Sequence, residues 1–386
     1  MFKRWLRLLW LVLFFALCLN QLSGYGKGSS SNVPKQKYKI GVIVYDNSDV
    51  MQQEINKYFT QHLAPAFNVE FIISDAIKDS NGEISFIENC AAKGVKGIIA
   101  FYNVTDFKKI LNLCKQHKIY YVLGAMNPDE KMLKAAEGNP YFLGGVGPGN
   151  SDYSAMYKMT KKFLEDGARS IVLPTGGKDW SVKMFIDRYN GVKDAIKDFE
   201  AKHPGVKIKV YEFGGFPNDA WFATQAKMIA LNPDAIVATF SGEFLWVQPL
   251  KDAGKAGKIK LGTLSSINPV AAQAMKEGVL HFLAGIYPQM TGLNFALLYN
   301  AMTGYAKDFK KDGKPVVITT DVAIIQSAQE MDKWMKIVYG KVPPYSADDL
   351  KKVCKVFNPK ATYNDFVKLC KECNYNDIIK RRGIKR

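Results

Sequence analysis

A glycine-rich run near the middle of the chain has residue types that could bind phosphate. The run GGVGPG spans residues 144–149, after an apolar stretch and before a helix-like pattern, which is the order found in nucleotide-binding loops. Pro148 removes a backbone N–H donor from this run, and several strand and helix units precede it, whereas a dinucleotide loop usually follows the first strand. We therefore interpret residues 144–149 as a crossing between two domains, in which the glycines supply turns.

The cysteines and histidines could form a metal, redox or catalytic site. CKEC, from Cys370 to Cys373, has the spacing of half a zinc site or a redox pair, but no second CxxC or His-rich segment accompanies it. Cys90 and Cys114 either contact each other or are simply buried, and we favour buried thiols. No nucleophile elbow or metal-spaced cluster surrounds the histidines, which are His62, His117, His203 and His281. An enzyme is thus the least favoured class, and we expect no cofactor and no metal.

The elements that must position any site follow a regular alternation. Strand-like runs such as KIGVIVY (39–45) and KGIIAFY (96–102) alternate with amphipathic segments such as DFKKILNLCKQH (106–117). After residue 149 the alternation restarts, with runs that include SIVLPT (170–175) and HFLAGI (281–286). The pattern predicts an α/β protein with two parallel-sheet domains of similar size, each too short to be a barrel.

The N-terminal segment predicts export. Lys3, Arg4 and Arg7 precede an apolar run from 8 to 19, which has the length of an export signal. No strong A-x-A site follows, so residues 1–26 are a cleaved signal peptide or an uncleaved signal anchor, and residues 27–37 are a linker. The protein is expected outside the cytoplasmic membrane, in the periplasm or at the outer face of the cell membrane.

The net charge of +17 indicates what this surface could meet. Anionic envelope polymers or lipid head groups are plausible neighbours for such a basic exported protein. We expect no nucleic acid partner.

Several short segments resemble a known family. RYNG (188–191), KDAGKAGKIKLGTLSS (251–266) and PQMTG (288–292), in this order, resemble the type I periplasmic sugar-binding proteins, the extracytoplasmic receptors of ABC importers, related in fold to ribose-binding protein and the LacI-type repressor cores. The resemblance covers roughly residues 37–345. It implies two Rossmann-like lobes joined by a three-segment hinge.

The family's three crossings imply where each lobe ends. Lobe 1 would span residues 38–147 and regain about 288–318, and lobe 2 would span 148–287 and regain about 319–345. Residues 346–386 would form a helical extension beyond the family core. The resemblance also implies a monomer that captures a small-molecule ligand by hinge closure and delivers it to an ABC permease in the membrane.

Ligands of open parallel sheets bind beyond the carboxyl ends of the strands. The candidate ligand-binding residues lie in the segments that follow the strands, and they are Tyr45, Asp46, Phe101, Tyr102, Asn127, Trp180, Arg188, Ser241, Glu243, Ser266, Tyr287 and Gln289. Arg188 matches the family's R-x-x-G segment, whose arginine contacts ligand. Its position at the edge of a buried helical stripe leaves an internal ion pair as the alternative.

The ligand itself stays open at the level of sequence. A sugar is the family default, but the family's polar residues are replaced at GAMNP (124–128), at TFSGE (239–243) and near Ser266. A nucleoside or another small polar or aromatic metabolite would suit the remaining residues. The alternative function is an exported ligand-sensing module that signals to a membrane sensor or chemoreceptor.

Overall fold

The computed structural model describes residues 34–101, 106–148, 151–180 and 182–383. The predicted export signal (1–26), most of the predicted linker (27–37) and the candidate site residue Tyr102 lie outside the described residues. Within the described residues, no helix is both long enough and apolar enough to span a membrane.

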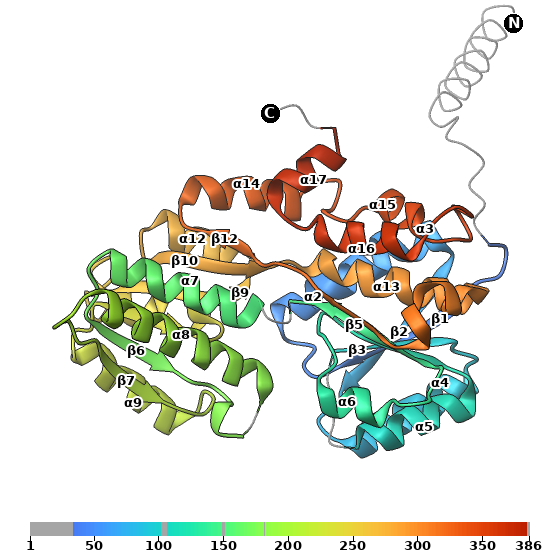
Figure 1. The fold of residues 1–386 in the computed structure, drawn as a ribbon, viewed down its shortest axis with the longest axis horizontal. Coiled ribbons are helices and arrows are strands. Elements are labelled where there is room, and N and C mark those ends of the chain that lie inside the picture. The colour runs from blue at the N-terminus through green and yellow to red at the C-terminus, as the bar shows by residue number, and fades with distance from the viewer. Residues whose placement is uncertain (1–33, 102–105, 149–150, 181, 384–386) are drawn as a thin grey trace, which may run out of the picture. The chain divides into compact units, whose positions relative to one another are not determined.

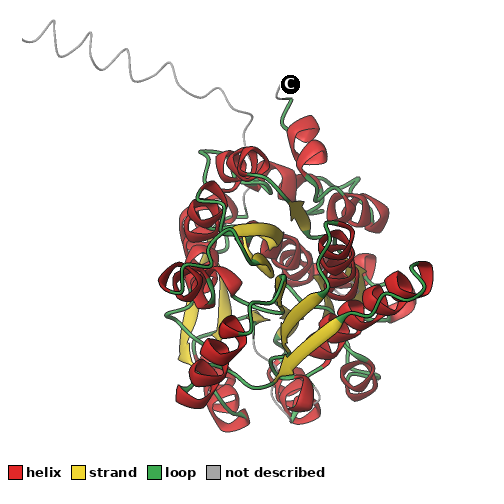
Figure 2. Ribbon diagram, turned by 90° about the vertical axis from the view of Figure 1, so that its left-hand side faces the viewer, coloured by secondary structure: helices red, strands yellow, loops and turns green. Residues whose placement is uncertain are grey.

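Lobe 1 is built on a six-stranded sheet in which every pairing is parallel. In spatial order its strands are β11 (Val316–Thr319), β5 (Phe142–Gly147), β4 (Tyr120–Leu123), β3 (Gly97–Ala100), β1 (Tyr38–Val44) and β2 (Val69–Ala76). Every residue of β3 and β5 is buried, as expected for strands covered by helices on both faces. Figure 2, which does not separate the lobes by colour, shows the strands of the protein with helices around them.

The helices of lobe 1 follow the apolar spacing of the sequence. They are α2 (Val50–Lys57), a π-helical segment (Tyr58–Leu63), α3 (Ala64–Phe67), α4 (Ser80–Ala92), α5 (Phe107–His117), α6 (Glu130–Ala135) and α13 (Thr291–Asn300). In α5, Phe107, Ile110, Leu111 and Cys114 are buried, because their spacing places them on one helix face. Helix α13 is buried along its whole length, since it lies between the sheet and the C-terminal segment (Figure 1).

Lobe 2 repeats this arrangement. Its strands in spatial order are β12 (Ala323–Ile325), β10 (Leu280–Ile286), β9 (Lys260–Ser266), β8 (Ala235–Ala238), β6 (Ser170–Pro174) and β7 (Lys209–Phe213). The strand β12 runs antiparallel to β10, and the other pairings are parallel. The helices are α7 (Ser151–Glu165), α8 (Lys183–Lys202), α9 (Asp219–Ala230), α10 (Gly242–Leu245), α11 (Val247–Asp252), α12 (Pro269–Lys276) and α14 (Ala328–Val338).

The chain passes between the two sheets three times. The crossings connect β5 to α7, β10 to the short 3-10 helix Pro288–Met290, and β11 to β12. The predicted fold class, two Rossmann-like lobes of parallel sheet joined by three segments, is therefore confirmed.

The glycines of the run 144–149 have a role that the sequence analysis did not predict. Gly144 and Gly147 belong to strand β5 and not to a turn. Gly144 has a φ of 93°, and a Cβ at this position would overlap the backbone of Val316 in the neighbouring strand β11. A Cβ at Gly147 would lie 2.5 Å from the Cα of Met126. These glycines permit close backbone approach, so the interpretation that Gly144 and Gly147 supply turns was wrong, while Gly149 lies outside the described residues.

Three further helices follow lobe 2, and they pack on parts of both lobes. They are α15 (Ala347–Lys352), α16 (Tyr363–Lys371) and α17 (Tyr375–Arg381). Phe366 contacts Phe309 of lobe 1, with ring centroids 5.9 Å apart, and Tyr375 contacts Trp334 of α14 at 5.8 Å. Lys371 donates to the carbonyl of Thr319 at the end of β11. The extension, red in Figure 1, thus lies against the second and third crossings.

Candidate functional site

A cavity of about 420 Å³ lies at the carboxyl ends of strands from both sheets. From lobe 1 it is lined by residues that include Tyr45, Asp46, Asp49, Gln52 and Phe101, and from lobe 2 by residues that include Arg188, Phe244, Ser265 and Ser266. The position matches the general rule for ligand sites in parallel sheets, and the volume is within the range of small-molecule sites. We call this cavity the cleft.

The lobe 1 side of the cleft carries two carboxylates in the segment between β1 and α2. Asp46 accepts hydrogen bonds from the backbone N–H and the hydroxyl of Ser48, and these bonds lower the pKa of Asp46. Asp49 caps α2 by accepting from the N–H of Gln52 at 2.7 Å. Both side chains present hydrogen-bond acceptors to the cleft.

Tyr45 adds a half-exposed ring to the same side of the cleft. The ammonium group of Lys78 lies 3.4 Å from the centroid of this ring, a cation–π contact. Phe101 adds a second ring from the end of β3.

Arg188 lies on the lobe 2 side and is paired within its own lobe. Its Nε donates to Asp152 of α7 at 2.8 Å, and its Nη1 donates to the carbonyl of Thr239 at 2.6 Å. Gly191 explains the R-x-x-G spacing, because a Cβ there would overlap the backbone of Tyr153 and separate α8 from α7. The structure therefore contains the internal ion pair that the sequence left as the alternative, on a residue that also lines the cleft.

Glu243 and the serines at the end of β9 form the remaining polar wall. Ser265 Oγ donates to Glu243 Oε1 at 2.7 Å, and Asn268 Nδ2 donates to the same oxygen at 2.7 Å. Glu243 is 2% exposed, and this burial raises the pKa of its carboxyl group. Glu243 lies behind Ser265 and Ser266, which line the cleft.

The structure brings together only part of the predicted site. Tyr45, Asp46, Phe101, Arg188 and Ser266 line the cleft, with Glu243 directly behind it. Three other predicted residues do not line this cavity, and they are Asn127, Trp180 and Ser241. Asn127 donates to Thr319 Oγ1, while Trp180 is 63% exposed and rests against Phe216. Ser241 has a left-handed backbone, with φ of 44°, at the start of α10.

Two predicted residues have structural partners elsewhere. Tyr287 is fully buried, and its hydroxyl donates to the carbonyl of Cys373 at 2.9 Å. Gln289 is also buried and donates to the carbonyl of Val338. Both lie away from the cleft lining, because the C-terminal extension and α14 cover the second crossing.

Sequence reasoning missed other residues of the lining, and Phe244 and Gln52 are two examples. Phe244 and Gln52 both line the cleft, although neither was among the candidates. Phe244 directly follows the candidate Glu243, and an aromatic residue at that place after a strand-like run was the signal that could have identified it. Gln52 lies inside the first turn of α2, where its side chain donates to Asn56, and its sequence position carries no comparable signal.

The cysteines do not form a disulfide or metal site among the described residues. Cys90, Cys114, Cys354, Cys370 and Cys373 are buried free thiols. Burial raises the pKa of Cys90 to about 11, which makes this thiol a poor nucleophile. In the described part of the chain, no group of three or more His, Cys, Asp or Glu side chains could hold a metal ion.

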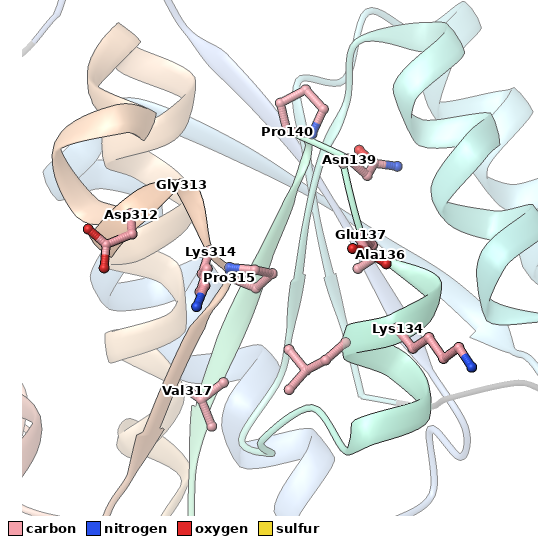
Figure 3. Close-up of a pocket in the computed structure, with 12 residues that line it drawn as sticks. Lys134, Ala136, Glu137, Asn139, Pro140, Asp312, Gly313, Lys314, Pro315 and Val317 are labelled. Carbon is pink, nitrogen blue, oxygen red and sulfur yellow. The ribbon is translucent and has the colours of Figure 1, made fainter.

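A larger cavity, of about 730 Å³, lies at the other end of lobe 1. Figure 3 shows its walls, which come from residues 133–140 on one side and 312–317 on the other. At this cavity, the side chain of Asn139 donates to the carbonyl of Leu111 and accepts from the backbone N–H of Tyr141. Because this cavity adjoins the starts of β5 and β11 and not their carboxyl ends, we do not assign the ligand site to it.

Comparison with known protein families shows which family this chain belongs to. A model of the periplasmic binding protein domain matches residues 40–307, which is more than half of the chain. The chain belongs to this family. No match was found among curated proteins. The match ends before β11, so the helical extension lies beyond the family's matched region.

Solved structures of several binding proteins share the fold. A galactofuranose binding protein superposes with a TM-score of 0.60 and 19% identity, over 77% of this chain and 98% of that chain. An ABC transporter solute binding protein from Bacillus halodurans C-125 with bound myo-inositol superposes with a TM-score of 0.60 and 19% identity, over 80% of this chain and 99% of that chain. An ABC transporter periplasmic solute binding protein from Actinobacillus succinogenes 130z with bound D-allose superposes with a TM-score of 0.60 and 18% identity, over 76% of this chain and 99% of that chain.

Proposed function

We propose that this protein is an extracytoplasmic substrate-binding protein of an ABC transporter. It captures a small polar solute, a sugar or a related polyol, in the cleft between its lobes. Hinge closure around the ligand then produces the form that a membrane permease recognises. In this proposal the protein is a monomer, has no cofactor and is not an enzyme.

The single observation that carries the proposal is a cleft lined by both lobes at the carboxyl ends of their strands. A ligand that contacts Asp46 on one lobe and Ser266 on the other stabilises the arrangement in which both lobes reach it. The three crossings between the lobes are the segments that would absorb the rotation.

The chemistry of the lining supports a polyol. Carboxylates and hydroxyls, from Asp46, Asp49, Ser265 and Ser266, suit a ligand with many hydroxyl groups. The rings of Tyr45, Phe101 and Phe244 offer apolar surface to the ring faces of such a ligand. The names of three structural neighbours mention galactofuranose, myo-inositol and D-allose, which makes these compounds the first to test.

Mass spectrometry of metabolites released from the purified, denatured protein would identify the ligand most directly. Calorimetry with galactofuranose, myo-inositol and D-allose should then show binding of one molecule per chain by at least one compound of this class. Phe244→Ala should weaken binding, whereas Phe222→Ala, which removes an equally exposed ring that does not line the cleft, should not. Turnover of the bound compound, or the absence of any bound or binding polyol, would contradict the proposal.

We also propose that residues 1–26 direct export and that residues 27–37 tether the folded part. N-terminal sequencing of the exported protein distinguishes the two forms of this proposal. A start after residue 19 indicates release by a signal peptidase, and a start at Met1 indicates an uncleaved anchor.

A further inference from the structure

A buried carboxyl group behind the cleft wall has one oxygen whose position its contacts in the fold do not explain. Glu243 is 2% exposed, and its Oε2 has no hydrogen-bond partner among the described residues. A buried acceptor without a partner is costly, so its presence in a native structure calls for an explanation. The side chain lies directly behind two serines that line the cleft.

The orientation of the neighbouring amide is determined by a helix cap. Asn268 Oδ1 accepts from the N–H of Ala271 at the start of α12, at 2.8 Å. The Nδ2 atom of Asn268 must therefore be the group that faces Glu243 Oε1 at 2.7 Å and Ser266 Oγ at 3.1 Å. The donors and acceptors of this network are thus assigned without ambiguity on the asparagine side.

The two serine hydroxyls consequently differ in the hydrogen-bonding role that each can offer to a ligand. Ser265 uses its only hydrogen for Glu243 Oε1, so it presents lone pairs to the cleft. The second hydrogen of Asn268 Nδ2 is shared between the backbone carbonyl and the hydroxyl of Ser266, each at 3.1 Å, so the Ser266 hydroxyl keeps its own hydrogen available to donate. A hydroxyl has one donor and two acceptor sites. The buried partner of each serine therefore determines whether its donor site or only its acceptor sites are left for a ligand.

We propose that Glu243 is a positioning residue that makes Ser265 an obligate hydrogen-bond acceptor, so that the cleft selects ligands with a hydroxyl or amine donor at this point. This inference rests on the proposed function, because it assigns a requirement to the ligand of the same cleft. A keto, ether or fluorine group cannot donate, and a ligand that places one of these against Ser265 leaves two acceptors facing each other.

The rest of the cleft also favours ligands that donate hydrogen bonds. Asp46 and Asp49 present acceptors from the opposite lobe, and the guanidinium of Arg188 is already paired with Asp152. Anionic ligands such as sugar acids and sugar phosphates would meet these carboxylates, which disfavours them although the ammonium group of Lys78 lies over the ring of Tyr45. The ligand class is therefore an uncharged or cationic polyol.

The test uses the full protein and calorimetry. Galactofuranose, myo-inositol and D-allose are measured first, and the compound that binds is compared with derivatives in which each hydroxyl in turn is replaced by fluorine. One derivative should bind at least 30-fold more weakly. A carboxylate or phosphate derivative of the same compound should also bind at least 30-fold more weakly.

Variants then assign this loss to Glu243. Glu243→Gln retains an oxygen that can accept from Ser265 and Asn268, so the fluorine penalty should persist. Glu243→Leu frees the Ser265 hydroxyl to donate, and the penalty should fall to 3-fold or less. If Glu243→Leu does not fold, Ser265→Ala replaces it, because removal of the acceptor should also abolish the penalty.

The outcomes separate this inference from the proposed function. A compound that binds without a penalty at any position, or a penalty unchanged in both Glu243→Leu and Ser265→Ala, overturns the role of Glu243 and leaves the binding function intact. If none of the compounds binds and no polyol is released from the purified protein, the proposed function fails, and the inference fails with it.

Discussion

At the scale of single residues, three buried ionisable groups differ in whether their surroundings favour the charged or the neutral form, because their hydrogen-bond partners differ. Arg188 has a carboxylate partner at 2.8 Å, Glu243 has two donors on one oxygen, and Glu83 has one donor, the hydroxyl of Tyr121 at 2.7 Å. An ion pair keeps both groups charged, whereas burial with few donors favours the neutral carboxyl group. The first and the last of these lead to predictions that need no ligand.

Arg188→Ala should lower the free energy of unfolding of the unliganded protein by about 3 kcal/mol or more, because it leaves the buried Asp152 carboxylate without its partner. Urea unfolding measures this change. Lys183→Ala is the matched control in the same helix, since Lys183 forms an exposed pair with Asp187, and it should cost about 0.5 kcal/mol or less. Equal effects of the two substitutions would show that the buried pair does not stabilise lobe 2.

Glu83 predicts a pH dependence of stability. Burial raises the pKa of its carboxyl group from 4.5 to about 7, so the folded protein holds a proton that the unfolded chain has released between these values. Stability from this group is complete below pH 4.5 and is lost as the pH rises through 7. Because one pKa unit corresponds to about 1.4 kcal/mol, the loss is on the order of 3 kcal/mol.

Urea unfolding at pH 5 and at pH 8 tests the Glu83 prediction, with Glu83→Gln as the comparison. The wild-type protein should lose more stability than the variant over this range, because glutamine does not titrate. An identical pH dependence of both proteins would mean that Glu83 is not protonated in the folded state at pH 5 to 7.

At the scale of elements, β5 shows why a glycine-rich strand occupies its position. Its neighbours β4 and β11 are parallel strands, and the segment around Met126 folds back over its end. Gly144, Gly145 and Gly147 each lie where a Cβ would meet backbone atoms of Val316 or Met126. Removal of the side chains therefore brings the first and third crossings together at this edge of lobe 1.

Gly144→Ala should lower the free energy of unfolding by about 3 kcal/mol or more, from the left-handed φ and from overlap with Val316 together. Gly94→Ala is the control, because Gly94 also has a positive φ, of 73°, but no atom within 4 Å of the added Cβ. The control should cost about 1 kcal/mol. If thermal and urea unfolding give the same loss for both variants, close approach to β11 is not what requires glycine at position 144.

At the scale of the whole molecule, the C-terminal extension is continuous with the core. Phe366, Cys370 and Ile378 are fully buried, and Cys373 touches two of the crossings. Its carbonyl accepts from Tyr287, and its thiol donates to the carbonyl of Asp321 at 3.7 Å. An element with these contacts should unfold together with the lobes and not before them.

Phe366→Ala should therefore destabilise the whole protein by about 3–5 kcal/mol, the usual cost of removing a buried phenylalanine. Tryptophan fluorescence and circular dichroism should report one coincident unfolding transition in both the variant and the wild type. Phe222→Ala removes a ring that is 45% exposed and should change stability by about 0.5 kcal/mol. An early separate transition in Phe366→Ala, with the main transition unmoved, would show that the extension folds independently.

The sequence alone determined the elements and the class of fold, because these depend on local periodicity. The alternation of buried strands with amphipathic helices identified both sheets, and the cap at Asn268 was visible as Asn-Pro before a helical pattern. Four of the twelve proposed ligand residues line the cleft for the same reason, since the end of a strand can be located from its pattern and ligands of such sheets bind there. Arg188, a fifth, lines it from within helix α8.

Tertiary structure alone decided which of these residues are available to a ligand. Tyr287 and Gln289 lie just after strand β10, and Ser266 ends strand β9, but helices from residues 328–381 cover the first two. Nothing in their local sequence reveals that cover. Arg188 found its partner in Asp152, 36 residues away, because two helices approach closely at Gly191. Contacts between distant segments depend on how the chain packs, and packing is not encoded in the periodicity of any one segment.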